Sequence, residues 1–191
     1  MKRKIIQICG GNGTGKTTLI KRLLESGPFY NSKLQIAGKT KEYWCDGDIA
    51  VIGKYNENRC CGLDSENYSI KDLLASINTV ISQQNPLVIL FEDMRLGSTY
   101  PCKEKLRMVA NNAGYEYCVI TLIADLTLIA KRIVERSGNE NVDFDARRML
   151  QKQCIRSSRK IEANGAKSYI VDTGRNTLDM TFSILKGIIN E

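Results

Sequence analysis

A glycine-rich stretch near the start of the sequence has the residue types and the spacing of a phosphate-binding loop. Gly10, Gly15, Lys16 and Thr17 fit the pattern G-x-x-x-x-G-K-[ST]. Glycines let successive backbone N–H groups approach phosphate oxygens that a side chain would obstruct. Lys16 is expected to reach the β- and γ-phosphates, and the Thr17 hydroxyl is placed to ligate Mg²⁺. We therefore predict that a nucleoside triphosphate is held by these residues: Gly11, Asn12, Gly13, Thr14, Gly15, Lys16, Thr17 and Thr18.

Two acids, Glu92 and Asp93, follow a second apolar run at 87–91. An acid there lies at the carboxyl end of a central strand, where ligands bind in open α/β sheets. Its carboxylate can hold a water of the Mg²⁺ shell or accept the proton of an attacking hydroxyl. We assign Glu92 to one of these two roles, as a catalytic residue and part of the metal site. The alternative is an edge acid that caps the next segment.

These residues lie between predicted strands and helices that alternate along the chain. Short apolar runs and helical stripes follow one another, which indicates right-handed βαβ units. We predict an α/β protein with the three-layer P-loop NTPase fold, in which helices cover both faces of a central, mostly parallel sheet. One domain is expected over residues 1–191. The clearest predicted strands are 4–9, 87–91 and 117–124, and the clearest helices are 70–81, 125–138 and a basic helix that extends through Lys160.

Composition narrows the class of protein further. No apolar run approaches the roughly 18 residues of a membrane span, and the apolar stretch at the start is too short for a signal peptide. The chain has seven cysteines but no histidine and no CxxC motif, so we expect reduced thiols rather than a zinc site. A cytoplasmic protein without a membrane partner is predicted, located in the host cytoplasm if the protein is viral.

The sequence resembles the small P-loop kinases of the nucleoside monophosphate kinase and shikimate kinase type over nearly its whole length. The resemblance is carried by "GGNGTGKTT", "LVILFED", "ITLIADLTLIAKRIVER" and "SYIVDTGRN". It implies ATP as phosphoryl donor, a lid at about 136–145 and an adenine-side loop that contains Arg175. Arg132 and Arg136, four residues apart on one helix face, match the lid arginines that brace the transferring phosphoryl group opposite Lys16. The alternative is that both arginines only solvate an amphipathic helix.

The segment at about 38–68 is where these kinases form the acceptor site. It contains Trp44 and Tyr55, which could stack on a base, and Asp64, which could act as general base for a hydroxyl. The alternative is a β-hairpin whose aromatic side chains pack on the sheet. Residues 49–98 also resemble a group of bacteriophage P-loop kinases, some implicated in phosphorylating 5-hydroxymethyluracil in DNA. This sequence departs from that group at Cys61 and Asp93, where glycine is usual.

Positive charge is concentrated near the predicted lid. The net charge is +7, and residues 131–160 contain nine lysines and arginines against four acids. Within the basic helix, a stripe of four cations recurs at intervals of four, four and three: Arg148, Lys152, Arg156 and Arg159. Such a stripe would suit a DNA backbone. It would equally suit ATP phosphates in a closing lid, or a solvated surface.

Together these features predict a Mg²⁺-dependent, ATP-using kinase. The expected catalytic residues are Lys16, Arg132, Arg136, Glu92 and Asp64. A nucleobase-bearing acceptor is expected, with 5-hydroxymethyluracil in phage DNA ahead of a free nucleoside or nucleotide. A small-metabolite kinase is disfavoured by the aromatic residues of the acceptor segment. A non-catalytic ATP-binding switch is the alternative from another class, and it would be expected to lack the lid arginines.

Overall fold

The computed structural model describes residues 2–55, 62–64, 68–138 and 140–191. A seven-stranded sheet in the order β2-β3-β4-β5-β1-β6-β7 forms its centre. The neighbouring strands β4, β5, β1, β6 and β7 pair in parallel. At the other edge, β2 pairs antiparallel with β3, and β3 pairs antiparallel with β4. The strands are β1 Lys4–Cys9, β2 Tyr30–Ile36, β3 Lys39–Cys45, β4 Ile49–Ile52, β5 Val88–Asp93, β6 Glu116–Ile123 and β7 Lys167–Asp172.

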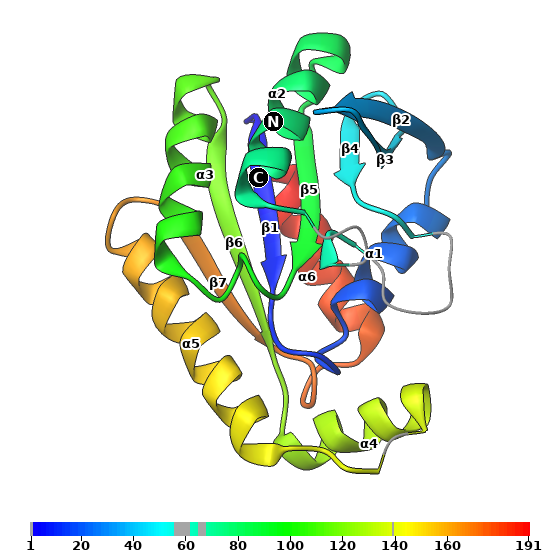
Figure 1. Cartoon of the computed structure of the whole chain (residues 1–191), viewed down its shortest axis with the longest axis vertical. Helices are drawn as coiled ribbons and strands as arrows, with labels where there is room; N and C mark the ends of the chain where they lie inside the picture. The colour runs from blue at the N-terminus through cyan, green and yellow to red at the C-terminus, as the bar shows by residue number, and fades with distance from the viewer. Residues whose placement is uncertain (1, 56–61, 65–67, 139) are drawn as a thin grey trace.

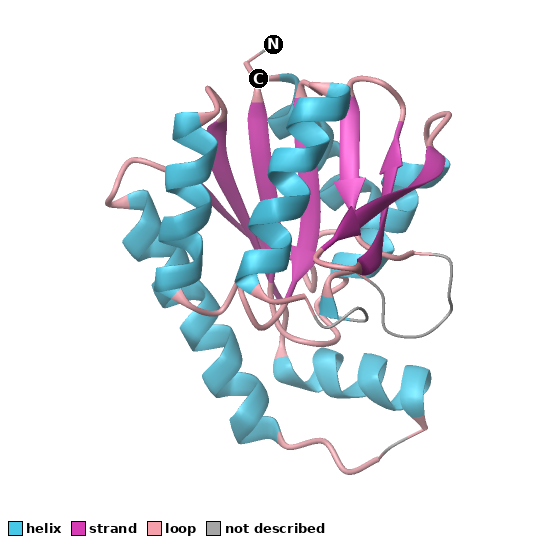
Figure 2. Cartoon of the chain, turned by 45° about the horizontal axis from the view of Figure 1, so that its top comes forward, coloured by secondary structure: helices cyan, strands magenta, loops and turns pink. Residues whose placement is uncertain are grey.

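Helices cover both faces of this sheet, which confirms the predicted fold class (Figure 2). One face packs against α2, α3 and α5, and the other packs against α1 and α6. The helices are α1 Lys16–Glu25, α2 Ile70–Gln84, α3 Tyr100–Asn112, α4 Leu126–Ser137, α5 Phe144–Glu162 and α6 Leu178–Asn190. No helix in the described part of the chain is long and apolar enough to cross a membrane.

The central strands are buried because helices lie on both of their faces. Every residue of β1 and of β5 is buried, and both strands are mainly apolar as parallel sheets require. Strand β1 lies between β5 and β6, with Cys9 opposite both Asp93 and Thr121. The chain therefore leaves β1 where the strand order changes direction, which is the usual place for a ligand in an open α/β sheet.

Part of the segment predicted to form the acceptor site contributes strands to the edge of the sheet. Strands β2 and β3 form an antiparallel hairpin next to β4, and the aromatic side chains of β3 pack against the core. Tyr55 is buried, and Trp44 is half-buried against the core on the α1 and α6 side. Residues 39–55 therefore agree with the β-hairpin alternative, because apolar side chains of β3 and β4 extend the core. Residues 56–61 and 65–67 of the predicted acceptor segment, with Cys61 among them, lie outside the described residues.

Candidate active site

The glycine-rich segment forms a loop between β1 and α1, as predicted. Gly10 has a φ of 151°, and a Cβ at this position would lie 2.5 Å from the carbonyl oxygen of Leu122. Gly13 has a φ of 82°, and a Cβ there would lie 2.9 Å from the carbonyl oxygen of Ile129. Both positions therefore require glycine for conformational and steric reasons. The loop ends at Lys16, the first residue of α1, so the positive end of the helix faces the loop.

Lys16 and Thr17 are the first two residues of α1 and follow the loop directly. Lys16 Nζ donates to the carbonyl oxygens of Gly10 at 2.9 Å and of Gly11 at 3.1 Å, so the ammonium group lies over its own loop. The Thr17 hydroxyl donates to Glu92 Oε1 at 2.7 Å. Glu92 is the penultimate residue of β5, and this contact joins the two predicted metal-site residues.

Glu92 is a buried acid with one unsatisfied oxygen. Burial raises the pKa of its carboxyl group, and Lys16 and the Thr17 hydroxyl act in the opposite direction. Its Oε2 atom is buried and has no hydrogen-bond partner among the described residues. Gly62, with a φ of 74°, covers this carboxylate, and a Cβ on Gly62 would lie 2.6 Å from Glu92 Cγ.

The oxygen atoms at this point fit Mg²⁺. The Thr17 hydroxyl and the unsatisfied Glu92 oxygen are hard ligands, which Mg²⁺ prefers. Among the described residues, no cluster of three or more acids, histidines or cysteines could hold a metal alone. This small protein ligand set suits Mg²⁺, which usually keeps several waters and shares its shell with substrate phosphates.

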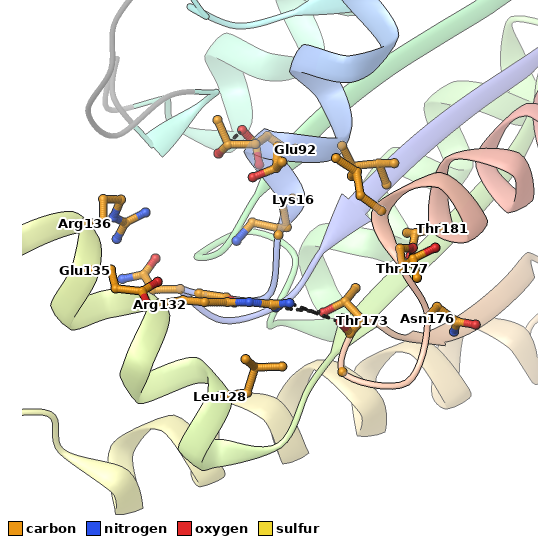
Figure 3. A pocket seen from close by; sticks show the side chains of 18 of the residues that line it. Lys16, Glu92, Leu128, Arg132, Glu135, Arg136, Thr173, Asn176, Thr177 and Thr181 are labelled. Atoms are coloured by element: carbon orange, nitrogen blue, oxygen red, sulfur yellow. Dashed lines mark hydrogen bonds between the residues drawn. The ribbon is translucent and has the colours of Figure 1, made fainter.

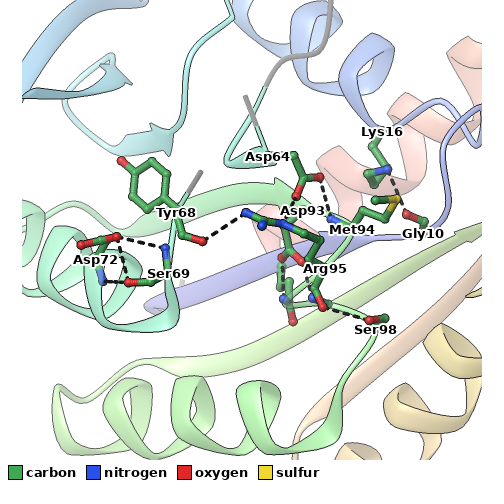
Figure 4. Close-up of polar contacts among 12 residues, drawn as sticks. Gly10, Lys16, Asp64, Tyr68, Ser69, Asp72, Asp93, Met94, Arg95 and Ser98 are labelled. Carbon is green, nitrogen blue, oxygen red and sulfur yellow. Dashed lines mark hydrogen bonds and ion pairs between the residues drawn. The ribbon is translucent and has the colours of Figure 1, made fainter. Parts of the chain in front are cut away.

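Asp64 lies close to Glu92 but is held by the loop that follows β5 (Figure 4). Its Oδ2 accepts a hydrogen bond from the Met94 backbone N–H at 3.0 Å, and its Oδ1 pairs with Arg95 Nε at 3.5 Å. Arg95 also donates to the carbonyl oxygen of Tyr68 at 3.5 Å and keeps about half of its side chain exposed. Sequence reasoning did not identify Arg95, although its position two residues after β5 was the available signal.

A cavity of about 710 Å³ connects these groups (Figure 3). This volume lies within the usual range for small-molecule sites. The α4 helix supplies one wall and the turn after β7 supplies another. The predicted site residues that line it are Asn12, Gly13, Gly15, Lys16, Thr17, Thr18, Asp64, Glu92, Arg132, Arg136 and Arg175. Gly11 and Thr14 do not line the cavity but shape the loop, because the Thr14 hydroxyl donates to Gly11 O at 2.8 Å.

Arg132 ties α4 to the phosphate loop and to the turn after β7. Its guanidinium donates to Gly13 O, Thr173 Oγ1 and Thr173 O, each at 3.1 Å. The Thr173 hydroxyl in turn donates to Thr14 O at 3.0 Å. Arg132 is therefore fixed against the cavity wall, and Thr173 is a site residue that the sequence analysis did not single out. The segment "SYIVDTGRN" contains Thr173, but Arg175 was the residue of this segment that we predicted to bind the nucleotide.

Arg136 and Arg175 are the two largely exposed arginines among the predicted site residues. Arg136, one turn after Arg132, makes no hydrogen bond within the described residues, and its charge lowers the pKa of Glu92. Arg175 pairs with Asp172 at 3.4 Å. The predicted lid at about 136–145 comprises the end of α4, the connection to α5 and the start of α5; Asn139 lies outside the described residues.

A second polar cluster lies behind the phosphate loop, on the opposite face of the sheet from Glu92. Lys103 of α3 is fully buried, and its Nζ donates to Cys9 Sγ at 3.4 Å and to Ser158 Oγ at 2.6 Å. The hydrogen bond with Cys154 lowers the pKa of the Cys9 thiol most, and Lys103 and Thr121 lower it further, to about 5, against the effect of burial. Cys9 Sγ and Lys103 Nζ therefore lie within hydrogen-bond distance of each other directly before the phosphate loop.

Comparison with known proteins supports the fold. The chain matches no protein-family model and no curated protein. It is similar to the crystal structure of the YorR protein from Bacillus subtilis in complex with phosphorylated GDP, with a TM-score of 0.59 and 16% identity over 98% of this chain and 96% of that one. It is also similar to deoxyadenosine kinase from M. mycoides with bound dCTP, with a TM-score of 0.50 and 12% identity over 98% and 100% of the two chains. The chain thus shares the α/β fold of these two structures, with a mostly parallel sheet covered by helices on both faces.

Proposed function

We propose that this protein is a Mg²⁺-dependent phosphotransferase that uses ATP and phosphorylates a nucleobase-bearing acceptor. The observation that carries the proposal is the contact between Thr17 and Glu92. It places a buried acid with an unsatisfied oxygen beside the phosphate loop, at the edge of a cavity large enough for a nucleotide. The kinase fold of the structural neighbours is consistent with this activity.

The donor triphosphate would lie along the loop, with its base toward the turn after β7. Lys16 would leave the Gly10 and Gly11 carbonyls and bind the β- and γ-phosphates, where charge accumulates in the transition state. The Thr17 hydroxyl would hold Mg²⁺, which would supply further neutralisation of the phosphate oxygens and leave Glu92 to act as a base. Arg136 would approach the phosphates from α4, on the opposite side of the cavity from α1. Arg132 fixes α4 to the loop through its hydrogen bond to Gly13 O.

Glu92 is assigned as the general base. Its pKa is raised by burial, which makes its carboxylate a better proton acceptor near neutral pH. The acceptor hydroxyl gives its proton to Glu92 while its oxygen bonds to the γ-phosphorus, and the bond to the β–γ bridging oxygen breaks. Asp64 already accepts from Met94 and pairs with Arg95, so we assign it a positioning role on the acceptor side.

The acceptor is proposed to enter beside Asp64 and Arg95. Arg95 presents a half-exposed guanidinium there, which can hold a phosphate or a base edge. We place 5-hydroxymethyluracil in DNA first among acceptors, because its hydroxyl is the group to be phosphorylated and the protein carries a strong positive charge. A free nucleoside or nucleotide would use the same groups.

A transfer assay tests the proposal. Wild-type protein, Lys16→Ala, Glu92→Gln and Asp64→Asn are incubated with γ-labelled ATP, Mg²⁺ and a panel of acceptors. The panel contains DNA with 5-hydroxymethyluracil, the same DNA unmodified, free nucleosides and free nucleotides. We expect Lys16→Ala to abolish labelling, Glu92→Gln to lower kcat by roughly 10²–10⁴-fold, and Asp64→Asn to act mainly on the acceptor KM.

Each alternative has its own outcome in the same assay. Label on a free nucleoside or nucleotide, with none on modified DNA, would keep the kinase and replace the DNA acceptor. ATP binding that is lost in Lys16→Ala, without transfer to any acceptor, would support the non-catalytic switch. Unchanged kcat in Glu92→Gln would refute the assignment of the base.

A further inference from the structure

The exposed side of α5 carries positive charge along its middle, and the acids of this helix, Asp145 and Glu162, lie near its two ends. Arg148, Lys152, Arg156 and Arg159, which we call the basic face of α5, are all exposed. At 100° per residue, these four positions fall within about 80° of one another around the helix axis. The helix runs along the outer side of the molecule beside α3 (Figures 1 and 2). The four cations therefore form one continuous stripe.

Most of this charge is not neutralised within the protein. Arg148 pairs with Asp145 at 2.8 Å, but both side chains are exposed, so this ion pair is weak and easily exchanged. Lys152, Arg156 and Arg159 form no ion pair in the part of the chain that the structure describes. Three cations on one helix face repel each other, and a polyanionic ligand would relieve that repulsion.

The basic face is separate from the nucleotide cavity. None of its four residues lines the 710 Å³ cavity or the smaller groove beside α1. The opposite side of α5 is anchored in the protein through Cys154, Ser158 and Ile161, which are buried. The helix therefore cannot rotate to bring these cations onto a bound triphosphate. The sequence had left open whether the stripe serves a lid, and the structure disfavours that alternative.

The basic face nevertheless begins close to the phosphate loop. Leu150, which lies on the inner side of α5, has its Cδ2 atom 3.6 Å from the position that a Cβ of Gly11 would occupy. One residue further along, Gln151 Oε1 accepts from the backbone N–H of Ala124 at 3.2 Å. A polymer bound along the basic face would thus extend from the vicinity of the active site across the outside of the molecule.

We propose that the basic face of α5 binds the phosphodiester backbone of a nucleic acid. From Arg148 to Arg159 the helix rises about 16 Å, at 1.5 Å per residue. That length matches about five phosphates of one strand at 3.4 Å per nucleotide. The exposed arginines and lysine contact phosphates and leave bases unread, so binding is independent of sequence. An anionic membrane is disfavoured because the inner face of α5 is already packed in the core and cannot enter lipid.

The test measures binding without catalysis. Fluorescence anisotropy is recorded with labelled single-stranded DNA, duplex DNA and RNA of one sequence, between about 50 and 200 mM salt. The basic-face variant is Lys152→Ala/Arg156→Ala/Arg159→Ala. The control variant, Lys33→Ala/Lys39→Ala/Lys71→Ala, loses the same charge from exposed positions on β2, β3 and α2. Circular dichroism and ATP binding show whether each variant is folded.

The loss of three phosphate contacts should reduce the salt slope on duplex DNA by about 2.7, at 0.9 per contact. The control variant should bind nearly as wild type. Equal binding by wild type and the basic-face variant, or equal losses in both variants, would overturn the proposal. Binding to phosphatidylserine vesicles but not to nucleic acid would also overturn it. A Lys16→Ala variant that loses ATP binding but keeps DNA binding separates this proposal from the kinase proposal, because the basic face does not require catalysis.

Discussion

Replacing Lys103 by methionine should destabilise the protein by an amount that increases with pH. Methionine keeps the length and much of the volume of the lysine side chain but removes the charge that faces Cys9 Sγ at 3.4 Å. At an effective dielectric constant of 20, two unit charges at that distance interact with about 5 kcal/mol. The loss is smaller than this value wherever Cys9 can take up a proton and become a neutral thiol.

The pKa of Cys9 sets the pH window. A thiol with an ordinary pKa of 9.0 that is lowered to about 5 stabilises the folded state above pH 9, and this stabilisation is lost as the pH falls through 5. At pH 7 the stabilisation is at most about 3 kcal/mol, and near pH 9 it approaches about 5 kcal/mol, at 1.36 kcal/mol per pH unit. Lys103 accounts for only part of it, because Cys154 also lowers the pKa.

Urea unfolding of four proteins tests this reasoning: wild type, Lys103→Met, Cys9→Ala and the double variant. We expect the cost of Lys103→Met to increase between about pH 6 and pH 9. The double variant should be much less destabilised than the sum of the single variants, because replacing both charged partners by apolar groups leaves no buried charge. Additivity within about 0.5 kcal/mol, or a cost that does not change with pH, would refute the ion pair. Thiolate absorbance in the folded wild type near pH 7, absent in Lys103→Met, is an independent readout.

Three further predictions concern the active site. Glu92→Gln should raise the free energy of unfolding at neutral pH by about 1 kcal/mol, because burial penalises the ionised acid, while lowering kcat for phosphoryl transfer by roughly 10²–10⁴-fold; lower stability in chemical denaturation would contradict this. Gly62→Ala should lower kcat by displacing Glu92, with little effect on the affinity for ATP measured by calorimetry; unchanged kcat would show that Gly62 does not position the acid. Arg132→Met should weaken ATP binding and destabilise the turn at Thr173, by about 1–3 kcal/mol in urea unfolding, since it leaves three acceptors without their donor.

Local signals predicted the fold and half of the site. The strand at 4–9, the helix that starts at Lys16 and the strand that leads to Glu92 each follow from short-range periodicity and glycine spacing. The aromatic residues of the predicted acceptor segment show the limit of such reasoning. Trp44 and Tyr55 have the same residue types whether they stack on a ligand or fill a core. Only the tertiary structure shows that Trp44, opposite Val51 of β4, and Tyr55 both pack against the core.

The sequence by itself determined that a phosphate-binding loop would follow a buried strand, because that motif needs only adjacent residues and their backbone freedom. Only the tertiary structure decided which distant groups meet there. It brought Glu92 to Thr17, joined Arg95 to Asp64, and placed Lys103 of α3 behind the loop. It also directed the cations of α5 away from the cavity, because the opposite side of that helix is buried against the sheet. These contacts depend on how strands and helices pack, which residue spacing along the chain does not encode.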